Sequence, residues 1–340
     1  FTTLIRSLLS DARFARSGRL SLTDWTRLLT RQVSTYFAGD SEEETSALGL
    51  CVRAFADLAE HDIDGRPVPY RAVHGLALQV VGIGTGSHGA ALDPEGLDLG
   101  RALELIRSGG DLHQLSRRPP PSDLHQLLQA VQAEAVLESI PVNYESGQPA
   151  ISYLTRALER GMHAITANKG PVVHAFAPLT ALAARHGRHF RFEAAVMDGA
   201  PLFSLWRECL PAARLESFRG ILNSTTNVIL SLMEQGNSFE AALAEAQRIG
   251  IAESDPSGDV EGWDAAIKVA ILVTVLMGVP IGLGQVQRRG IEGLTEVEIR
   301  QASQAGRRWK LVCSAKRIGE RVEARVGPKQ LDQGDPLFHV

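Results

Sequence analysis

The sequence predicts an α/β protein in which a doubly wound parallel sheet is followed by a second, mixed α/β domain. Between Leu76 and Val196, short apolar runs alternate with segments of helical periodicity. This order is typical of parallel strands joined by crossover helices. After Val196 the alternation stops, and one strand-like run is followed by three helical segments. The chain of 340 residues is longer than one small domain and has the length expected of two.

In the first part of the chain, strands and helices follow one another in turn. Strands are expected at residues 76–83, 135–140, 163–166 and 189–196, and helices at residues 98–109, 121–134, 148–161 and 171–187. Ser122 or Asp123 is the expected N-cap of the second helix, and Pro171 opens the fourth, because proline is tolerated in a first helical turn. Before Leu76 the pattern predicts an amphipathic helix at residues 47–61 and only weakly indicates a strand at 33–37.

In the second part, a strand is expected at residues 214–222, and helices are expected at residues 238–250, 264–278 and 295–306. Thr295 and Glu298 have the spacing of a capping box, which marks the start of the last helix. The longest apolar run begins at Val269 and is interrupted by Pro280. It is shorter than the ~20 residues that span a bilayer, so it predicts a buried helix.

Composition excludes several classes of partner. Hydrophobic residues make up 44% and charged residues 22% of the chain, and the net charge is −4. No basic surplus favours nucleic acid or an anionic membrane as a partner. Cys51, Cys209 and Cys313 are far apart and lack metal-binding spacing. They indicate reduced thiols, and with no visible signal peptide we expect a cytoplasmic protein.

The glycine-rich stretch "GIGTGSHG", residues 82–89, follows a predicted strand as a pyrophosphate loop would. Such a loop must open a helix at once, but Pro94 and Gly96 stop any helix soon after it. Two alternatives remain: a flexible loop, or the loop after the second strand of a βαβ unit, where the adenosine ribose binds. The loop has no acid for a ribose hydroxyl, which favours NADP. It offers Thr85, Ser87 and His88.

A carboxylate-rich loop leads into the apolar helix at residues 264–278. Asp264 and Lys268 are four residues apart on one face of this helix, and Glu253, Asp255 and Asp259 precede them. A structural ion pair would explain the helical pair alone. Carboxylates in the loop could also bind the ammonium group of an amino-acid substrate, and a buried lysine could transfer a proton.

Three further segments carry polar groups beside predicted strands. Lys169 in "TANKGP" follows a strand end, where open α/β sheets bind ligands. "NSTTN", residues 223–227, could cap the next helix or contact a ligand. "EAAVMDGAPLF", from Glu193, ends a strand in a turn whose carbonyls could bind Na⁺.

Together, "TANKGP", "EAAVMDGAP", "RGILNSTTNVIL" and "AESDPSGDVEGWDAAIKVAIL" resemble the homoserine dehydrogenase family in their order and spacing. The resemblance covers roughly residues 76–335. It implies a Rossmann-type nucleotide-binding domain at residues 1–167, a substrate and dimerisation domain with a mixed sheet at 168–320, and the start of a return segment to the nucleotide domain at 321–340. It also implies a homodimer that interconverts L-aspartate 4-semialdehyde and L-homoserine with NADP or NAD, for threonine and methionine biosynthesis.

The resemblance implies a role for each matching position. Lys268 would donate a proton to the aldehyde oxygen, and Lys169 would lie between nicotinamide and substrate. The substrate would be held by Glu253, Asp259, Asp264, Asn223 and Thr225. The cofactor would contact Gly49, Thr85, Ser87, His88, Ile140, Asn168 and Lys169. Sodium would be bound largely by backbone carbonyls, at Glu193, Val196, Asp198 and Ala200.

The cofactor half departs from the family pattern. Only Gly49 stands at a loop-glycine position in "ALGLCV", and the preceding acids would repel a pyrophosphate. Ile140 stands where the family usually has a threonine. These departures support an alternative: a homologue that no longer holds a nucleotide, either a non-redox binding protein or an incomplete gene product.

Overall fold

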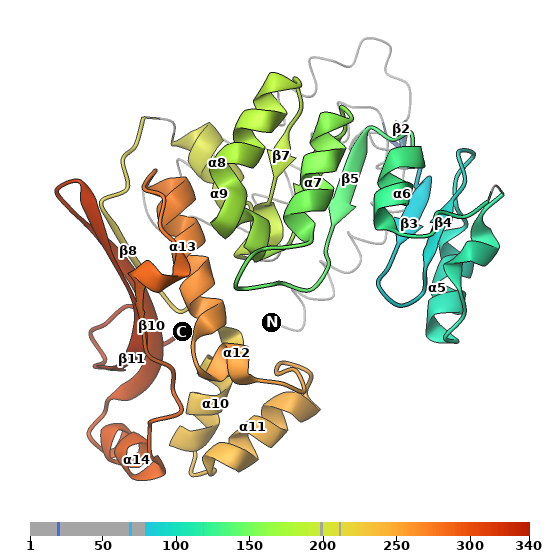
Figure 1. Cartoon of the computed structure of the whole chain (residues 1–340). Coiled ribbons are helices and arrows are strands. Elements are labelled where there is room, and N and C mark those ends of the chain that lie inside the picture. The colour runs from blue at the N-terminus through green and yellow to red at the C-terminus, as the bar shows by residue number, and fades with distance from the viewer. Residues whose placement is uncertain (1–18, 21–67, 70–78, 118, 198–199, 211) are drawn as a thin grey trace. The chain divides into compact units, whose positions relative to one another are not determined.

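The structure, a computed structural model of the chain, describes residues 19–20, 68–69, 79–117, 119–197, 200–210 and 212–340 (Figure 1). The chain divides into two compact units, Phe1–Val80 and Val81–Val340. In the first unit, β1 (Arg19–Leu20) pairs antiparallel with β2 (Val68–Pro69). The predicted strand at 33–37, the predicted helix at 47–61, and Gly49 and Cys51 within that helix lie outside the described residues.

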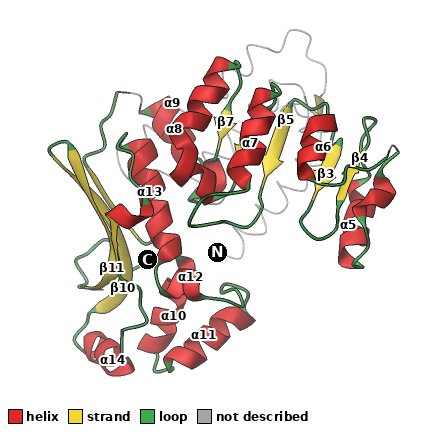
Figure 2. Cartoon of the chain, in the orientation of Figure 1, coloured by secondary structure: helices red, strands yellow, loops and turns green. Residues whose placement is uncertain are grey.

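A three-stranded parallel sheet forms the first layer of the second unit (Figure 2). Its strands, in spatial order, are β5 (Ala135–Glu138), β6 (His163–Thr166) and β7 (Phe190–Arg191). They are joined by α7 (Ala150–Glu159) and α8 (Lys169–Arg185). Leu154, Leu158 and Leu179 of these helices are buried in one core with Ala164 and Phe190 of the sheet. The predicted α/β alternation is confirmed here. Because α8 leads into β7, the parallel sheet extends beyond residue 168, where the second domain was expected to begin.

The last predicted strand of this layer is shorter than expected. β7 ends at Arg191, and the 3-10 turn η2 (Glu193–Ala195) replaces the rest of the predicted strand. The carboxylate of Glu193 accepts hydrogen bonds from the backbone N–H groups of Phe203 at 2.7 Å and Ser204. These groups belong to the first turn of α9 (Leu202–Cys209). These hydrogen bonds join the chain just after β7 to the start of α9.

The glycine-rich stretch forms a β-hairpin, which corrects the sequence prediction. β3 (Gly82–Gly84) pairs antiparallel with β4 (Ala90–Leu92), and the N–H of Thr85 donates to the carbonyl of Gly89 at 3.0 Å. Gly89 has φ +71°, a conformation that side chains disfavour. Among the described residues, β3 has no parallel partner. The chain thus turns back at Gly89 instead of continuing as a loop after a parallel strand.

The helices after this hairpin begin where the sequence predicts. They are α5 (Leu99–Arg107) and α6 (Leu124–Ala130), and the 3-10 turn η1 (Leu112–Leu115) between them was not predicted. Asp98 and Asp123 are the N-caps of α5 and α6, and each carboxylate accepts a backbone N–H bond from its first turn. This is the capping geometry that short acidic side chains favour.

A mixed four-stranded sheet forms the second layer. In spatial order its strands are β8 (Ser217–Gly220), β10 (Arg308–Ile318), β11 (Arg321–Leu331) and β9 (Val286–Arg288). Only β9 and β11 run parallel, which confirms the expected mixed sheet. The sequence analysis missed β9, β10 and β11. The expected boundary at residue 320 falls inside the β10–β11 hairpin, so residues 321–331 belong to this sheet.

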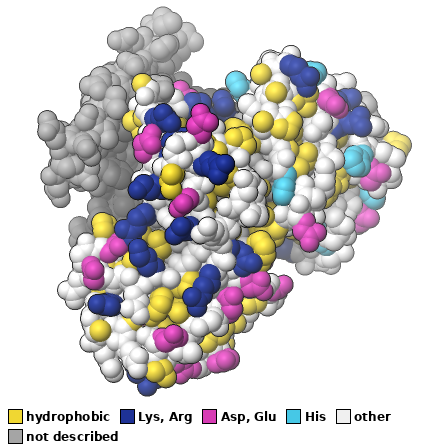
Figure 3. Space-filling view, turned by 60° about the vertical axis from the view of Figure 1, so that its left-hand side comes forward, with side chains coloured by type: hydrophobic (Ala, Val, Ile, Leu, Met, Phe, Trp, Pro, Cys, Tyr) yellow, Lys and Arg dark blue, Asp and Glu magenta, His cyan; other side chains and the backbone are white. Residues whose placement is uncertain are grey.

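The mixed sheet carries charges of both signs on its exposed positions. Lys316 of β10 is paired in register with Glu323 of β11, and Glu323 also forms an ion pair with Arg325. On the face shown in Figure 3, Lys and Arg side chains likewise lie among Asp and Glu. Adjacent charges of opposite sign compensate one another on this surface.

The helix α13 (Trp263–Leu276) lies between the two layers and contributes to both cores. Ile267 and Ile271 pack into the core of the parallel sheet, whereas Val269 and Val273 pack into the core of the mixed sheet. All four side chains are fully buried, and each contributes roughly 1.5–3 kcal/mol to folding. The buried-helix prediction is confirmed, and α13 carries Asp264 and Lys268 into the interior.

The remaining helices flank α13 and the mixed sheet. They are α10 (Ser224–Glu234), α11 (Phe239–Arg248), α12 (Ser257–Val260), the 3-10 turn η3 (Leu283–Gln285) and α14 (Glu296–Gln304). Thr295 and Glu298 form the predicted capping box of α14. No helix in the described part of the chain is long and apolar enough to cross a membrane.

Candidate active site

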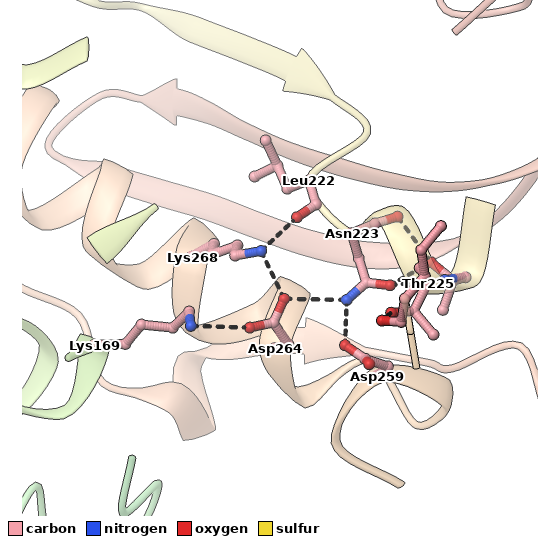
Figure 4. A network of polar contacts seen from close by, with 9 residues as sticks. Lys169, Leu222, Asn223, Thr225, Asp259, Asp264 and Lys268 are labelled. Atoms are coloured by element: carbon pink, nitrogen blue, oxygen red, sulfur yellow. Dashed lines mark hydrogen bonds and ion pairs between the residues drawn. The ribbon is translucent and has the colours of Figure 1, made fainter. Parts of the chain in front are cut away.

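Asp264 is the centre of a polar network at the start of α13 (Figure 4). Its Oδ2 lies 2.7 Å from Nζ of Lys268, one helical turn later. Its Oδ1 lies 3.3 Å from Nζ of Lys169, the first residue of α8. The side chains of both lysines are largely buried, with 16% exposure for Lys268 and 23% for Lys169. One carboxylate thus contacts two ammonium groups, one from its own helix α13 and one from α8 of the parallel-sheet layer.

Asn223 joins this network from the N-cap position of α10. Its Oδ1 accepts the N–H of Thr226 at 2.8 Å, and its Nδ2 donates to Asp259 Oδ1 at 2.5 Å and to Asp264 Oδ2 at 3.0 Å. The sequence left open whether this polar segment caps a helix or contacts a ligand. The capping role of Asn223 is confirmed, and the other end of its amide contacts the carboxylates of Asp259 and Asp264.

The ammonium group of Lys268 is held on two sides. Besides the ion pair with Asp264, it donates to the carbonyl of Leu222 at 2.8 Å. A lysine ammonium has three N–H donors. Among the described residues Lys268 uses two of them, so one proton is available for another acceptor.

The pKa of Asp264 reflects two opposing effects. Burial alone would raise it, but the positive charges of Lys268 and then Lys169, with hydrogen bonds from Lys268 and Asn223, lower it below its usual range. Asp264 is therefore ionised at neutral pH. The cluster of Lys169, Asp264 and Lys268 pairs one negative charge with the two lysine side chains.

A cleft of about 1330 Å³ opens beside this network. Of the predicted residues, Lys169, Glu253, Asp259 and Asp264 line it, and Glu145, Asp255 and Glu261 add further carboxylates. The basic groups on its wall are Lys169, His174 and Arg288. An acid-rich wall with few cations favours a ligand that carries an ammonium group.

Tyr144 lines the same cleft and was not singled out from the sequence. Burial, followed by the negative charges of Asp264, Asp259 and Glu253, raises the pKa of its phenol to about 12. Its hydroxyl therefore remains a neutral hydrogen-bond donor near these carboxylates. A tyrosine between two motifs carries no signal in the sequence, because the acids around it come from a distant loop.

Asn168 and Ile140, both expected at the cofactor, contact each other beside the cleft. Asn168 is the N-cap of α8 and accepts the N–H of Gly170 at 2.9 Å. Its Nδ2 donates to the carbonyl of Ile140 at 3.1 Å and to Glu138 Oε1 at 3.3 Å. The helix α8 begins two residues before the predicted start at Pro171, because Asn168 supplies the cap.

Several predicted residues lie elsewhere. The hydroxyl of Thr225 donates to the carbonyl of Ile251 at 3.1 Å and holds the chain just before Glu253. Thr85 and His88 stabilise the β3–β4 turn: Thr85 Oγ1 accepts the His88 N–H at 2.8 Å, and His88 Nδ1 contacts the Gly110 carbonyl at 3.0 Å. Ser87 lies in this turn, and none of the three lines the cleft. Gly49 and Asp198 lie outside the described residues.

The expected sodium positions include one side chain that is already engaged. The carboxylate of Glu193 accepts four hydrogen bonds at the start of α9, among them the hydroxyl of Ser204 at 2.7 Å. The Ala200 carbonyl accepts the N–H of Leu202 at 2.9 Å. No group of three His, Cys, Asp or Glu side chains suited to a metal occurs among the described residues. A cation here would depend on backbone carbonyls, including that of Val196.

Comparisons with known proteins agree on one family. The sequence model described as "Homoserine dehydrogenase" matches residues 201–340. The chain is 34% identical to the NAD(+)-dependent homoserine dehydrogenase of Pseudomonas canavaninivorans over 289 residues, which cover 85% of this chain and 81% of that protein. It is 38% identical to a homoserine dehydrogenase of Methanocaldococcus jannaschii over 236 residues, covering 69% and 70%.

Solved structures give the same result. A homoserine dehydrogenase from Thiobacillus denitrificans superposes with a TM-score of 0.60 at 34% identity, covering 72% of this chain and 54% of that one. The present chain thus spans about half the length of that structure. A putative homoserine dehydrogenase from Archaeoglobus fulgidus superposes with a TM-score of 0.66 at 30% identity, covering 76% and 75%.

Proposed function

Because the chain belongs to the homoserine dehydrogenase family of oxidoreductases, we propose that its acid-lined cleft interconverts L-aspartate 4-semialdehyde and L-homoserine with NAD(P). The observation that carries this proposal is the pair of lysines held on one buried carboxylate: Asp264 and Lys169 line the cleft, and Lys268 contacts Asp264 at 2.7 Å without being part of the cleft wall. This arrangement supplies a proton and positive charge where reduction of an aldehyde needs both.

In the direction of reduction, Lys268 donates the proton. A nicotinamide bound in this cleft would supply the hydride, and negative charge would then develop on the aldehyde oxygen. The ammonium group of Lys268 is fixed by Asp264 and the Leu222 carbonyl, and its third proton is directed to that oxygen. Lys268 is left as a neutral amine, and it recovers a proton from water before the next cycle.

Lys169 keeps the site electrically balanced during this transfer. Once Lys268 has lost its proton, the Lys169 ammonium still neutralises Asp264 at 3.3 Å. Without it, a buried carboxylate would remain unpaired, and unpaired buried charges are costly. Lys169 also lines the cleft and therefore adds positive charge beside the substrate oxygen.

Glu253 and Asp259 are proposed to recognise the ammonium group of the substrate. Both line the cleft, and both act on the pKa of Tyr144, so their charges act on the same region. Asp259 is oriented by Asn223. Both oxygens of Asp264 are occupied by lysines and by Asn223, so we assign Asp264 to holding the lysines beside the substrate hydroxyl.

The residues present fit the nicotinamide end of a dinucleotide. The carboxyl ends of β5 and β6 lead to Ser139, Pro141 and Lys169 on the cleft wall, and open parallel sheets bind nucleotides at such strand ends. We further propose that the cofactor is NADP or NAD, as the family resemblance implies, because the hairpin at residues 82–92 supplies no argument for one over the other. From the family resemblance alone, we also propose that the chain forms a homodimer. On the same basis, we propose that a sodium ion is bound by the backbone carbonyls of residues 193–200.

A homoserine-dependent reduction assay tests the function directly. The full chain is expected to reduce NADP⁺ in the presence of L-homoserine and to oxidise NADPH in the presence of aspartate semialdehyde, followed by absorbance at 340 nm. Comparing NADP⁺ with NAD⁺ shows which cofactor is preferred. Absence of turnover with both cofactors, together with absence of NADPH binding in a calorimetric titration, would overturn the proposal. Light scattering gives the oligomeric state, and replacing Na⁺ by choline tests the cation.

A further inference from the structure

A buried glutamate at the end of β5 has no part in the chemistry proposed above. Glu138 is 6% exposed, and among the described residues its carboxylate has hydrogen-bond partners but no ion pair. The sequence indicated only a strand at this position. A buried carboxylate is costly unless it is fully hydrogen-bonded. Its contacts therefore show what it holds in place.

The three partners of Glu138 are all donors, and they come from three different segments. Oε2 accepts the hydroxyl of Thr166, at the end of β6, at 2.5 Å. Oε1 accepts the N–H of Ile140 at 2.8 Å and the side-chain amide of Asn168 at 3.3 Å. The two carboxylate oxygens of Glu138 accept from all three donors together. Glu138 thus joins the ends of two parallel strands to the cap of α8.

The same contacts fix the residue from which Lys169 extends. The N–H of Asn168 donates to Thr166 Oγ1 at 2.9 Å, so the Thr166 hydroxyl has its proton free for Glu138. The Asn168 side chain then accepts the N–H of Gly170 at 2.9 Å. Lys169 lies between these two residues. Its backbone is therefore held on both sides by groups that Glu138 organises.

The side chain of Lys169 is less constrained than its backbone. Its ammonium group makes one ion pair among the described residues, with Asp264 at 3.3 Å. A long, flexible side chain with one contact reaches Asp264 only if the backbone from which it extends is fixed. Packing leaves little room for the backbone of Lys169 to lie elsewhere, because a Cβ on the next residue, Gly170, would lie 2.9 Å from Cα of Gly147.

We propose that Glu138 is a positioning residue that places the Lys169 ammonium group beside Asp264. This inference rests on the proposed function, in which Lys169 balances the charge of Asp264 during proton transfer. Small misplacements of catalytic groups reduce the rate of the chemical step more than substrate binding. Loss of Glu138 should therefore lower kcat and leave KM for homoserine nearly unchanged.

The test is a double-mutant cycle in the full chain with Glu138→Ala, Lys169→Ala and the double variant. We expect Glu138→Ala to lower kcat by about 10- to 100-fold, with KM for homoserine within about threefold. Adding Glu138→Ala to Lys169→Ala should change kcat by less than about twofold, because residues that act through one another are not additive. Glu138→Gln keeps the shape and one acceptor oxygen, and should recover kcat to within about fivefold of wild type.

A control removes a different carboxylate that is partly buried. Glu234 on α10 lies near Arg308, with 3.6 Å between Oε2 and Nε, and has no contact with the Lys169 network. Glu234→Gln should leave kcat within about twofold of wild type in both backgrounds. A general sensitivity to the loss of buried charge would instead lower kcat in this variant too, and would overturn the assignment to Glu138.

The remaining outcomes separate the inference from the function. A full additive loss in the double variant, or a wild-type kcat in folded Glu138→Ala, overturns the positioning role alone. A wild-type rate in Lys169→Ala overturns the role of Lys169 in the proposed function. If circular dichroism shows that Glu138→Ala does not fold, the Glu138→Gln cycle decides the question. That cycle supports the role if its loss of kcat disappears in the Lys169→Ala background, and overturns it if the loss persists.

Discussion

Replacing Lys268 by methionine removes the proposed proton donor and keeps a side chain of similar length. Two contacts are lost, with Asp264 at 2.7 Å and with the Leu222 carbonyl at 2.8 Å. General acid catalysis typically contributes 10²- to 10⁴-fold, so kcat should fall by about that factor, equivalent to roughly 2.7–5.4 kcal/mol of transition-state stabilisation.

The cost of this substitution in stability is expected to be smaller. Removing one partner of a buried ion pair typically costs about 3–5 kcal/mol, because the other charge is left unpaired. Asp264 keeps Lys169 and the amide of Asn223 in the variant. The loss in the free energy of unfolding should therefore lie at or below the lower end of this range, about 3 kcal/mol.

The assay compares homoserine-dependent NADP⁺ reduction with NADPH binding by fluorescence. Lys268→Met should lose turnover and still bind NADPH, with a cooperative thermal transition. Lys316→Met, at an exposed position of β10, is the matched control and should keep wild-type kcat. Near-normal turnover in Lys268→Met would refute the proposed mechanism, because that mechanism assigns proton donation to Lys268 alone.

Three further variants test the surrounding network. Tyr144→Phe should remove the tyrosine that ionises near pH 12, so the absorbance titration at 295 nm should differ from wild type only above about pH 11; a difference near pH 10 would contradict the raised pKa. Asp264 has a lowered folded pKa, so its stabilisation is present above the unfolded pKa of about 3.8 and is lost as pH falls through the folded value. The free energy of unfolding of Asp264→Asn should therefore depend less on pH below about 4 than that of wild type, and an equal slope would refute the coupling. Asn223→Ala removes a helix cap as well as the amide between Asp259 and Asp264, and should lower the free energy of unfolding in urea by about 1–2 kcal/mol or more; an unchanged midpoint would exclude the capping role.

Local sequence patterns predicted the starts of the helices well, but they missed the β3–β4 hairpin and the long strands of the mixed sheet. Asp123 and Thr295 cap helices as expected, and Asp98 and Ser238, the first residues of two predicted helices, are N-caps as well, because a cap depends on residues within one turn. β3 and β4 form a hairpin instead of a parallel strand and a loop. Pairing partners are not encoded in a short apolar run, so its direction in a sheet could not be deduced.

The long strands β10 and β11 were missed for a related reason. β11 alternates residues such as Val322, Ala324 and Val326 with charged ones, which is a strand pattern in itself. Their burial depends on α13 and the mixed-sheet core, which come from earlier parts of the chain. The resemblance placed a domain boundary between the two strands, whereas eleven register pairs from Arg308 to Leu331 join them.

The site divides in the same way between local and distant signals. Asp264 and Lys268 could be paired from the sequence, because their spacing places them on one face of a helix. Lys169 could be placed at a strand end, but its contact with Asp264 spans two layers and required the structure. Glu138 had no signal at all. Its side-chain partners Thr166 and Asn168 are 28 and 30 residues away, so only the parallel pairing of β5 and β6 brings them together.

The position of α13 explains why this site needs a shared carboxylate. A helix that is apolar on both sides can bury one lysine only if that lysine is paired, and Asp264 is the residue one turn away that can pair with it. A single Asp–Lys pair would carry a net negative charge whenever Lys268 gave up its proton. The second ammonium group, Lys169 on α8, still neutralises the Asp264 carboxylate at that moment. In the proposed mechanism, catalysis depends on the contact between α8 and α13, so a substitution that shifts α8 against α13 should lower kcat even where no proposed catalytic side chain is changed.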